Sequence, residues 1–359
     1  MAIVFVTGSG GLIGSSAARR FLELGCEVVG IDNDSRSYFF GPSASTRWMV
    51  DELSESRGYT HYSVDIRDMD SLERIFTKYS SALDCIIHCA AQPSHDWAAK
   101  EPHTDFGINA VGTLNLLELT RKYRPNAPFV FTSTNKVYGD APNRLPLEET
   151  PTRFEISRGH EFFGRGIPES FSIDQSLHSI FGASKVAADV MVQEYGRYFG
   201  MNTVCFRGGC LTGPAHSAAP LHGFLGYLAK CAITNTPYTI IGHGGKQVRD
   251  NIHSDDVVSA FLEYIRAPRP GATYNLGGGI ENNCSILEAI EMIEKITSRK
   301  ISISHDPKSR IGDHIWYVSD LSKLKSDYPN WQITKSLEVT IKEICAAYQD
   351  RFGAGKSSG

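Results

Sequence analysis

The sequence contains no long apolar run, no block of basic residues and no closely spaced cysteine pair. No stretch approaches the roughly 18 apolar residues that a membrane-spanning helix needs, and the N-terminal MAIVFVTG lacks the basic start and long apolar segment of a signal peptide. The formal net charge of −4 gives no electrostatic reason to expect a nucleic acid or an anionic membrane as a partner. These absences predict a cytoplasmic protein.

The eight cysteines are scattered, at positions 26, 85, 89, 205, 210, 231, 284 and 345, without any CxxC pair. This spacing indicates neither a zinc site nor a disulfide framework, and it is typical of reduced thiols. We therefore expect no bound metal.

What is present is the composition of a large globular protein. The chain has 359 residues, of which 41% are hydrophobic and 21% charged. This length exceeds that of one ordinary domain, so we expect two unequal domains around a sizeable buried core.

The first part of the chain alternates apolar runs with amphipathic stretches. The runs AIVFVT, EVVGI, LDCIIHCAA and PFVFTS are interrupted by a helix-like segment from Leu12 to Leu24. An order of strand, helix and strand predicts an α/β fold of the Rossmann type, with a doubly wound parallel sheet. Such a sheet binds its ligands beyond the strand ends.

The later chain predicts three further features. Long helices are expected over 103–123 and 178–199, which either pack together or form a dimer face. From Gly213 the shorter elements PYTIIG, ATYNLGG and KISISHD indicate a smaller domain interleaved with the first. We therefore expect an NAD-binding domain mainly over 1–212, a substrate domain mainly over 213–352 and a flexible tail over 353–359. Residues 140–177 form either a substrate lid or a surface excursion.

The run TGSGGLIG places Gly8, Gly11 and Gly14 after an apolar strand and before a helix. In this context the first glycine allows a tight turn, the second lets the backbone approach a pyrophosphate, and the third permits close packing of the helix. Leu12 and Ile13 then open the helix, whose N-terminus favours negative charge. These residues predict a dinucleotide site.

The second strand ends at Asp32, where a carboxylate accepts the hydroxyls of the adenosine ribose and repels a 2′-phosphate. The residue favours NAD, although nearby Arg36 keeps NADP open, and Asp32 alternatively only caps a loop. Asn33 belongs to the same predicted site. Asp65 and Ile66 follow the third strand and are candidates for adenine contacts, although an ordinary strand-end aspartate is an equal explanation.

Several motifs resemble the extended short-chain dehydrogenase/reductase family, also called the NAD-dependent epimerase/dehydratase family. They are the glycine spacing, HCAAQ at 88–92, STNKVYGD at 133–140, GASK at 182–185, RDNIHSDD at 249–256 and YNLGG at 274–278. Within that family STNKVYGD, FRGGCLTGP and GKQVRDNIHS most resemble the CDP-paratose 2-epimerases. The resemblance spans essentially the whole chain. It implies further cofactor contacts at Ala90, Ala91, Gln92, Asn109, Ser133 and Lys185.

In that family an oxidised nicotinamide takes hydride from a sugar carbon, and a tyrosine takes the hydroxyl proton. By resemblance, Thr134 bonds the same oxygen, Lys185 is the lysine that lowers the tyrosine pKa, and Asn109 supports that lysine. The tyrosine itself does not carry over, because the YxxxK motif reads FGASK at 181–185. Phe181 has neither an ionisable proton nor an oxygen.

Three interpretations of Phe181 stay open. In the first, the acid–base group has moved to another residue of the cleft, with Tyr138, His95, Asp96 or Lys185 as candidates. In the second, the protein catalyses a related NAD-dependent step that needs no tyrosine. In the third, it binds NAD and a nucleotide sugar without turnover.

The individual candidates each have a plainer alternative. His95 and Asp96 follow the fourth strand, where the family's loop borders the substrate, and an imidazole beside a carboxylate suits proton transfer. A histidine in a loop is also commonly a surface residue. Tyr138 is expected to pack behind the loop rather than to reach substrate.

Asn135 and Lys136 separate this chain from part of the family. Members that remove water from the sugar carry Asp-Glu there, because elimination needs a paired acid and base. The Asn-Lys pair argues against a 4,6-dehydratase and resembles the CDP-paratose 2-epimerases. Lys136 is a candidate for substrate binding, with a solvated turn residue as the alternative.

For the nucleotide diphosphate, the resemblance implies Arg249 and Arg310, because guanidinium groups match phosphate oxygens. Each arginine alternatively pairs with a neighbouring acid. Cys210 stands where many relatives place an asparagine beside the diphosphate, and its size indicates packing rather than nucleophilic attack.

These interpretations converge on an NAD-dependent sugar-nucleotide epimerase that acts through a transient ketosugar. The alternatives are another NAD-dependent conversion, such as an oxidation-linked elimination or a ketoreduction, and a binding protein without turnover. By resemblance, the two long helices pair across a homodimer.

Overall fold

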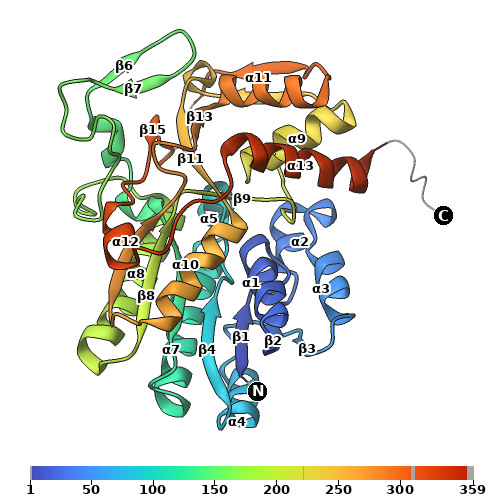
Figure 1. Ribbon diagram of the computed structural model, residues 1–359, viewed down its shortest axis with the longest axis vertical. Coiled ribbons are helices and arrows are strands. Elements are labelled where there is room, and N and C mark those ends of the chain that lie inside the picture. The colour runs from blue at the N-terminus through green and yellow to red at the C-terminus, as the bar shows by residue number, and fades with distance from the viewer. Residues whose placement is uncertain (1, 221, 309–311, 354–359) are drawn as a thin grey trace.

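A parallel sheet of seven strands forms the larger part of the protein (Figure 1). The computed structural model describes residues 2–220, 222–308 and 312–353. The strand order is β12-β8-β5-β4-β1-β2-β3, and every neighbouring pair is parallel. The strands are β1 Ile3–Thr7, β2 Glu27–Ile31, β3 Tyr59–Tyr62, β4 Leu83–His88, β5 Phe129–Thr134, β8 Thr203–Gly208 and β12 Ala272–Leu276. This arrangement confirms the predicted fold class.

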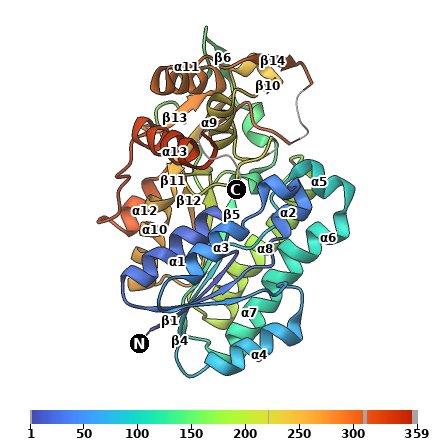
Figure 2. The ribbon, with the colours of Figure 1, turned by 90° about the vertical axis from the view of Figure 1, so that its right-hand side faces the viewer.

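Helices cover both faces of the sheet, which is why its central strands are rich in buried apolar residues. One face packs against α1 (Leu12–Glu23), α3 (Arg47–Ser54), α10 (Ser254–Arg266) and α12 (Ser322–Asp327). The other packs against α4 (Met69–Tyr79), α7 (Gly112–Tyr123) and α8 (Ser179–Phe199). Figure 2 shows α1 and α10 on one side of the sheet and α7 and α8 on the other.

The two long predicted helices are present and pack against each other. The first consists of α6 (Pro102–Phe106), a π-helical turn (Gly107–Val111) and α7, and the second is α8. The amide of Asn109 in the π-helical turn donates to Ser184 Oγ at 3.0 Å. Tyr195 on α8 donates to Glu118 on α7 at 2.5 Å. Of the two expected arrangements, packing within the chain is therefore realised.

A second body of shorter elements lies at the carboxyl end of the large sheet (Figure 2). Strand β11 (Val248–His253) pairs with β9 (Cys210–Thr212), β13 (Asn283–Ser285) and β15 (Trp316–Tyr317), and β10 (Tyr238–Ile241) pairs with β14 (Ile303–Asp306). Helices α9 (Phe224–Thr234), α11 (Ile286–Thr297) and α13 (Leu337–Phe352) share a separate apolar cluster. Residues of this second body, such as Tyr238 and Arg249, line the same pocket as the glycine turn.

The chain crosses between the two bodies more than once. The run ATYNLGG forms β12, which lies at the edge of the large sheet beside β8, and α10 packs against α1. The exact division into domains at residue 213 stays a prediction. Gly353 is described, and the rest of the predicted tail, 354–359, lies outside the described residues.

Residues 140–177 pack on the smaller sheet and do not reach the pocket. They contain a turn of 3-10 helix (Ala141–Arg144) and the hairpin β6 (Leu147–Glu149) and β7 (Phe154–Ile156). Ile156 and Ile167 are buried with Trp316 and Val318. The whole segment is described and none of it lines the pocket, so of the two alternatives the structure favours a surface excursion over a lid.

The remaining helices are short connections around the pocket. They are α2 (Ser35–Phe40), α5 (His95–Lys100) and turns of 3-10 helix at Pro42–Ala44, Asn135–Tyr138 and His243–Gly245. Among the described residues, no helix has both the length and the apolar composition to cross a membrane.

Candidate active site

A pocket of about 480 Å³ lies where the carboxyl ends of the large sheet meet the second body. Nearly all of the predicted cofactor residues line it. These are Gly8, Gly11, Leu12, Ile13, Gly14, Asp32, Asn33, Arg36, Asp65, Ile66, Ala90, Ala91, Ser133 and Lys185. The same pocket is lined by Lys136, Cys210 and Arg249, so the structure brings the predicted cofactor and substrate residues into one cavity.

The glycine turn after β1 has the geometry that the spacing predicts. Gly8 has a φ of 67°, and a Cβ there would lie 2.8 Å from the backbone nitrogen of Ala90. A Cβ on Gly14 would lie 2.1 Å from the Gly8 carbonyl oxygen. Gly11 caps α1, and the first turn of the helix, from Leu12 to Gly14, lines the pocket, where a helix N-terminus favours an anion. The turn therefore fits the diphosphate of a dinucleotide.

Asp32 joins the glycine turn to the end of β2. One carboxylate oxygen accepts the N–H of Gly10 at 2.9 Å, and the other accepts the N–H of Asp34 at 2.8 Å. Burial raises the pKa of Asp32, and these two hydrogen bonds act in the opposite direction. The residue thus secures the loop, as the plainer alternative expected, and it also lines the pocket.

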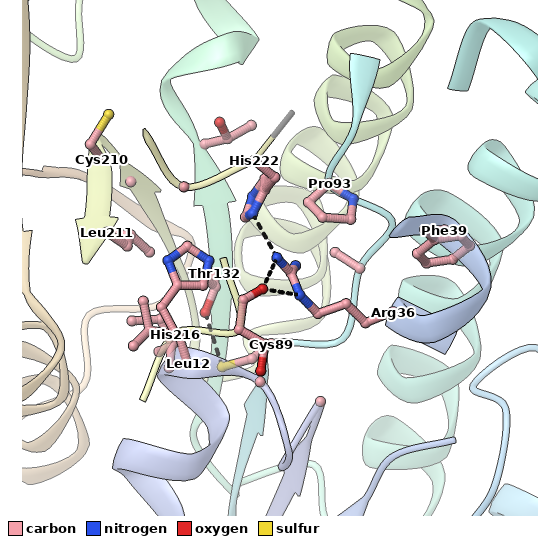
Figure 3. Close-up of a pocket in the computed structure, with 18 of the residues that line it drawn as sticks. Leu12, Arg36, Phe39, Cys89, Pro93, Thr132, Cys210, Leu211, His216 and His222 are labelled. Carbon is pink, nitrogen blue, oxygen red and sulfur yellow. Dashed lines mark hydrogen bonds between the residues drawn. The ribbon is translucent and has the colours of Figure 1, made fainter. Parts of the chain in front are cut away.

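The Arg36 guanidinium binds other groups of the protein and is not left available for a phosphate. Its Nε and NH2 groups both donate to the Ser217 carbonyl, at 3.0 and 2.7 Å, and its guanidinium carbon lies 4.8 Å from the Phe40 ring centroid. Figure 3 shows the Arg36 side chain directed toward His222, whose Nδ1 lies 3.4 Å from the Arg36 NH2 group. Trp48 Nε1 donates to Ser217 Oγ at 3.0 Å, which fastens the same segment. Because Arg36 already has these partners, the geometry favours NAD over NADP.

The Asp32→Asn variant is expected to lose most of the preference for NAD over NADP. The change removes the negative charge that repels a 2′-phosphate and weakens charge-assisted hydrogen bonds to a ribose, worth about 1.5–3 kcal/mol. We expect NAD affinity to fall by about tenfold or more while NADP affinity does not fall, measured by calorimetry with each dinucleotide. Asp51→Asn, at an exposed site on α3, is the matched control. A preference unchanged in Asp32→Asn would contradict this role.

The adenine end carries two predicted residues, Asp65 and Ile66, which both line the pocket. Asp65 accepts hydrogen bonds from Arg67 at 2.7 Å and from Asn33 at 3.2 Å. Although burial alone would raise it, Arg67 lowers the pKa of Asp65. The carboxylate is therefore charged and already bound within the loop, which matches the strand-end alternative as well as an adenine contact.

Thr134, Phe181 and Lys185 line one end of the pocket, which we call the reacting end after the role predicted for these residues. Phe181 is buried in the wall, at the position of the family tyrosine. Lys185 Nζ donates to the Thr132 carbonyl at 2.9 Å and lies 4.1 Å from the Phe131 ring centroid. Burial lowers the pKa of Lys185 to about 8. A cation and a hydroxyl thus remain at this end without the phenol.

Four predicted residues do not line the pocket. Tyr138 is wholly buried behind it, where it donates to Asn275 at 2.7 Å and accepts from Arg207 at 3.2 Å. This confirms that Tyr138 packs behind the loop, and it removes Tyr138 as a group that reaches substrate. Asp96 is exposed and outside the lining.

Gln92 and Asn109 lie in a buried hydrogen-bond network behind the wall. The Gln92 amide donates to Asp105 at 2.8 Å, and Asn109 Oδ1 accepts the backbone N–H of Gln92 at 3.0 Å. Asn109 contacts Ser184, the neighbour of Lys185, rather than the lysine itself. The structure therefore gives both residues a supporting position instead of direct contact with a cofactor.

The opposite end of the pocket holds two cations that share one acid. Arg249 NH2 lies 2.8 Å and Lys136 Nζ 3.2 Å from the same carboxylate oxygen of Asp313. Although burial alone would raise it, Arg249 and Lys136 hold the pKa of Asp313 well below its usual range. The side chain of Lys136 is only 14% exposed, so it is not a solvated turn residue. The cluster keeps a net positive charge toward the pocket.

Cys210 and Arg310 complete the predicted substrate residues. Burial raises the pKa of the Cys210 thiol to about 12, so the group stays protonated and suits a packing role. Arg310 lies outside the described residues.

Sequence reasoning missed three residues at this site: Ser179, His222 and Asp313. Asp313 follows Arg310 by three positions in the run SRIGDH, so an acid beside a predicted phosphate-binding arginine was a usable signal. No local pattern marks Ser179 or His222, because their partners His95 and Arg36 are distant in sequence.

Comparison with known proteins agrees with this geometry. The model of the NAD dependent epimerase/dehydratase family matches residues 4–277. CDP-paratose 2-epimerase from Salmonella typhi is 34% identical over 89% of this chain and 92% of that protein. The dTDP-glucose 4,6-dehydratase of Salmonella typhimurium is 27% identical over 96% of this chain and 92% of its own length. The structure of Thermus thermophilus UDP-glucose 4-epimerase in complex with NAD has the same fold, with a TM-score of 0.77 at 24% identity, covering 97% and 99% of the two chains.

The family match extends over most of the chain and includes the glycine turn, the strand-end Asp32 and the lysine of the YxxxK motif. The identity to the Salmonella typhi protein extends further, over nearly the whole length. The chain belongs to the NAD-dependent epimerase/dehydratase family, and NAD is the cofactor of that family.

Proposed function

We propose that this protein is an NAD-dependent nucleotide-sugar epimerase, related in activity to the CDP-paratose 2-epimerases. One observation carries the proposal: a single pocket runs from the glycine turn to the pair of Lys136 and Arg249. The first end suits the diphosphate of a dinucleotide, and the second suits the diphosphate of a nucleotide sugar. A sugar between them lies beside Thr134 and Lys185.

In this proposal, the glycine turn and Asp32 would hold NAD, which would supply the hydride chemistry needed to invert one sugar carbon. The protein's own residues orient the sugar and handle charge. Arg249 and Lys136 bind the diphosphate after exchanging their contact with Asp313, and Lys185 stabilises negative charge on the reacting oxygen. Because hydride is returned, NAD is not consumed.

Two alternatives are kept for stated reasons. A dehydratase needs a paired acid and base, and Asn135 and Lys136 stand in the place of that pair. A ketoreduction would change the redox state of free NAD, whereas an oxidation-linked elimination returns the hydride to the sugar, as epimerisation does, and would instead be recognised by the loss of water. Phe181 favours the second alternative, a protein that binds NAD and a nucleotide sugar without turnover.

An NMR time course of the purified protein with CDP-, UDP-, GDP- and dTDP-hexoses distinguishes these alternatives. The proposal predicts a new stereoisomer of one sugar, without net NADH. Loss of water from the sugar would favour the dehydratase, and net NADH a dehydrogenase. Saturable binding of a nucleotide sugar without any conversion would support the binding protein and contradict the proposal.

The proposal includes a homodimer that pairs through the outer faces of α7 and α8. Exposed apolar side chains on α8 and in the π-helical turn that leads into α7 support it, namely Ile180, Val190, Met191, Tyr198 and Phe199 on α8 and Val111 in the turn. A face of this kind is typical of a protein–protein contact. A cytoplasmic location, which the scattered cysteines support, is part of the same proposal.

The double variant Met191→Glu/Tyr198→Glu is expected to convert the dimer into a monomer, because it places charges within an apolar contact. Light scattering coupled to size-exclusion chromatography measures the mass. Val339→Glu changes an exposed apolar residue on α13 and should leave the dimer unchanged. A double variant that keeps the dimer mass, or a wild-type monomer, would place the contact elsewhere or remove it.

A further inference from the structure

His95 stands directly against the residue that replaces the family tyrosine. It begins α5 and lines the pocket. The His95 and Phe181 rings lie edge to face, with centroids 5.0 Å apart and an interplanar angle of 68°. The imidazole is therefore the titratable side chain beside the position that a tyrosine phenol would otherwise occupy.

Ser179 holds this imidazole in one orientation. Its Oγ lies 2.7 Å from His95 Nδ1 and also accepts the N–H of Gly182 at 3.3 Å. Ser179 has a φ of 59°, in the left-handed region that serine rarely adopts. A residue keeps such a strained backbone conformation where the surrounding structure enforces it. A hydroxyl oxygen can accept two hydrogen bonds. In the tautomer whose Nδ1 proton is directed to Oγ, the basic lone pair of the ring is on Nε2.

The other candidates for the proton acceptor are less well placed. Tyr138 is buried behind the wall, Asp96 is exposed outside the lining, and Lys185 donates a hydrogen bond to the Thr132 carbonyl oxygen. Thr134 lines the pocket and can bond the reacting oxygen, but a hydroxyl is a poor base near neutral pH.

We propose that His95 is the acid–base residue of this protein, with Ser179 as the residue that positions it and Phe181 as the apolar wall that replaces the tyrosine. The inference rests on the proposed function. As the substrate O–H bond breaks, its proton goes to His95 Nε2, while the hydrogen on the same carbon leaves as hydride to NAD and a C=O bond forms. On the return, the carbon regains hydride on its opposite face and the oxygen regains the proton from Nε2, so that atoms and electrons balance.

The central experiment compares His95→Gln with the wild-type holoenzyme. We expect kcat to fall by about 10²–10⁴-fold, the range for loss of a general acid–base group, while affinity for the nucleotide sugar stays within threefold by calorimetry. His103→Gln, at an exposed histidine on α6, is the matched control and should keep kcat within twofold. A His95→Gln variant with kcat within threefold of wild type would overturn the proposal.

A second readout does not depend on turnover. Nitrogen-15 NMR of the histidine side chains reports which ring nitrogen of neutral His95 carries the proton. We expect the ring proton on Nδ1 in the wild type. In Ser179→Gly we expect it to exchange between the two ring nitrogens, because glycine tolerates the positive φ but lacks the hydroxyl. A wild-type ring protonated on Nε2 would overturn the assignment.

A rescue variant separates proton transfer from a structural effect. The double variant His95→Gln/Phe181→Tyr is expected to have a kcat at least tenfold higher than that of His95→Gln, because the phenol supplies an acid–base group in the neighbouring position. No return of activity would overturn the proposal. A wild-type protein that converts no nucleotide sugar would instead remove the proposed function, and activity that first appears in Phe181→Tyr would show that no residue had replaced the tyrosine.

Discussion

Replacing Lys185 with methionine is expected to lower kcat by about 10²–10³-fold, the range for removal of one preorganised donor at a developing negative charge. Lys185 is buried at the reacting end of the pocket, where a cation interacts strongly with charge on the substrate oxygen. Methionine keeps the length of the side chain but carries no charge. Lys100→Met, on the exposed end of α5, is the control, and steady-state kinetics on the epimerised sugar is the measurement.

The pH profile gives the same prediction a second test. Burial lowers the pKa of Lys185 to about 8, so the ammonium loses its proton as the pH rises through that value. The wild-type rate is therefore expected to decline above about pH 8, and Lys185→Met should lack this decline. The thermal stability of Lys185→Met should not fall, because the variant removes a buried charge and the cost of its desolvation. A variant with near wild-type kcat, or with the same alkaline decline, would contradict the role.

Removing Asp189 is expected to lower the free energy of unfolding by about 3–5 kcal/mol, the usual cost of leaving one partner of a buried ion pair alone. Asp189 on α8 contacts Arg207 on β8 through both oxygens, at 2.9 and 3.2 Å, and both side chains are almost fully buried. Ser133 donates to the same carboxylate at 2.5 Å. The Asp189 carboxylate thus holds both β8 and the end of β5 against α8, beside the pocket.

Urea denaturation of Asp189→Ala against Glu194→Ala measures this difference. Glu194 pairs with Arg197 on the same helix, but both side chains are exposed, so its loss should cost less than about 1 kcal/mol. Asp189→Ala is also expected to weaken NAD binding, since Ser133 loses its partner. Equal and small losses in the two variants would show that the buried pair contributes little.

The parts of the fold that could be predicted are those that depend on residues close together in the sequence. The strand, the glycine turn and the first helix follow from adjacent residues, because the positive φ of Gly8 and the missing Cβ of Gly14 are local requirements. The long helices follow from their periodicity in the same way. Asp32 was predictable because its distance from the turn is set by one strand, one helix and one further strand.

The parts that could not be predicted depend on residues that are distant in the chain. Asp313 is 177 residues from Lys136, and Ser179 is 84 residues from His95. Whether two such side chains meet is decided by tertiary packing, which no periodicity records. The final strand of the large sheet, β12, was grouped with the smaller domain for this reason, since its short apolar run does not identify its neighbours.

Phe181 illustrates what a motif can and cannot provide. The run at 181–185 predicted residues of the site, and the structure places Phe181 and Lys185 in the lining of the pocket. It also revealed that the tyrosine is missing, but the contact between the His95 and Phe181 rings became visible only once α5 and α8 were packed together.

The most direct test of the account uses a nucleotide sugar that carries deuterium at every carbon of its hexose ring. Incubation in ordinary water with the NAD-loaded protein, followed by NMR, reports both configuration and label. We predict a new stereoisomer that keeps deuterium at the inverted carbon, with no net NADH, because the hydride leaves that carbon and returns to it. Deuterium replaced by solvent hydrogen at the inverted carbon, or formation of one NADH per sugar, would contradict the account.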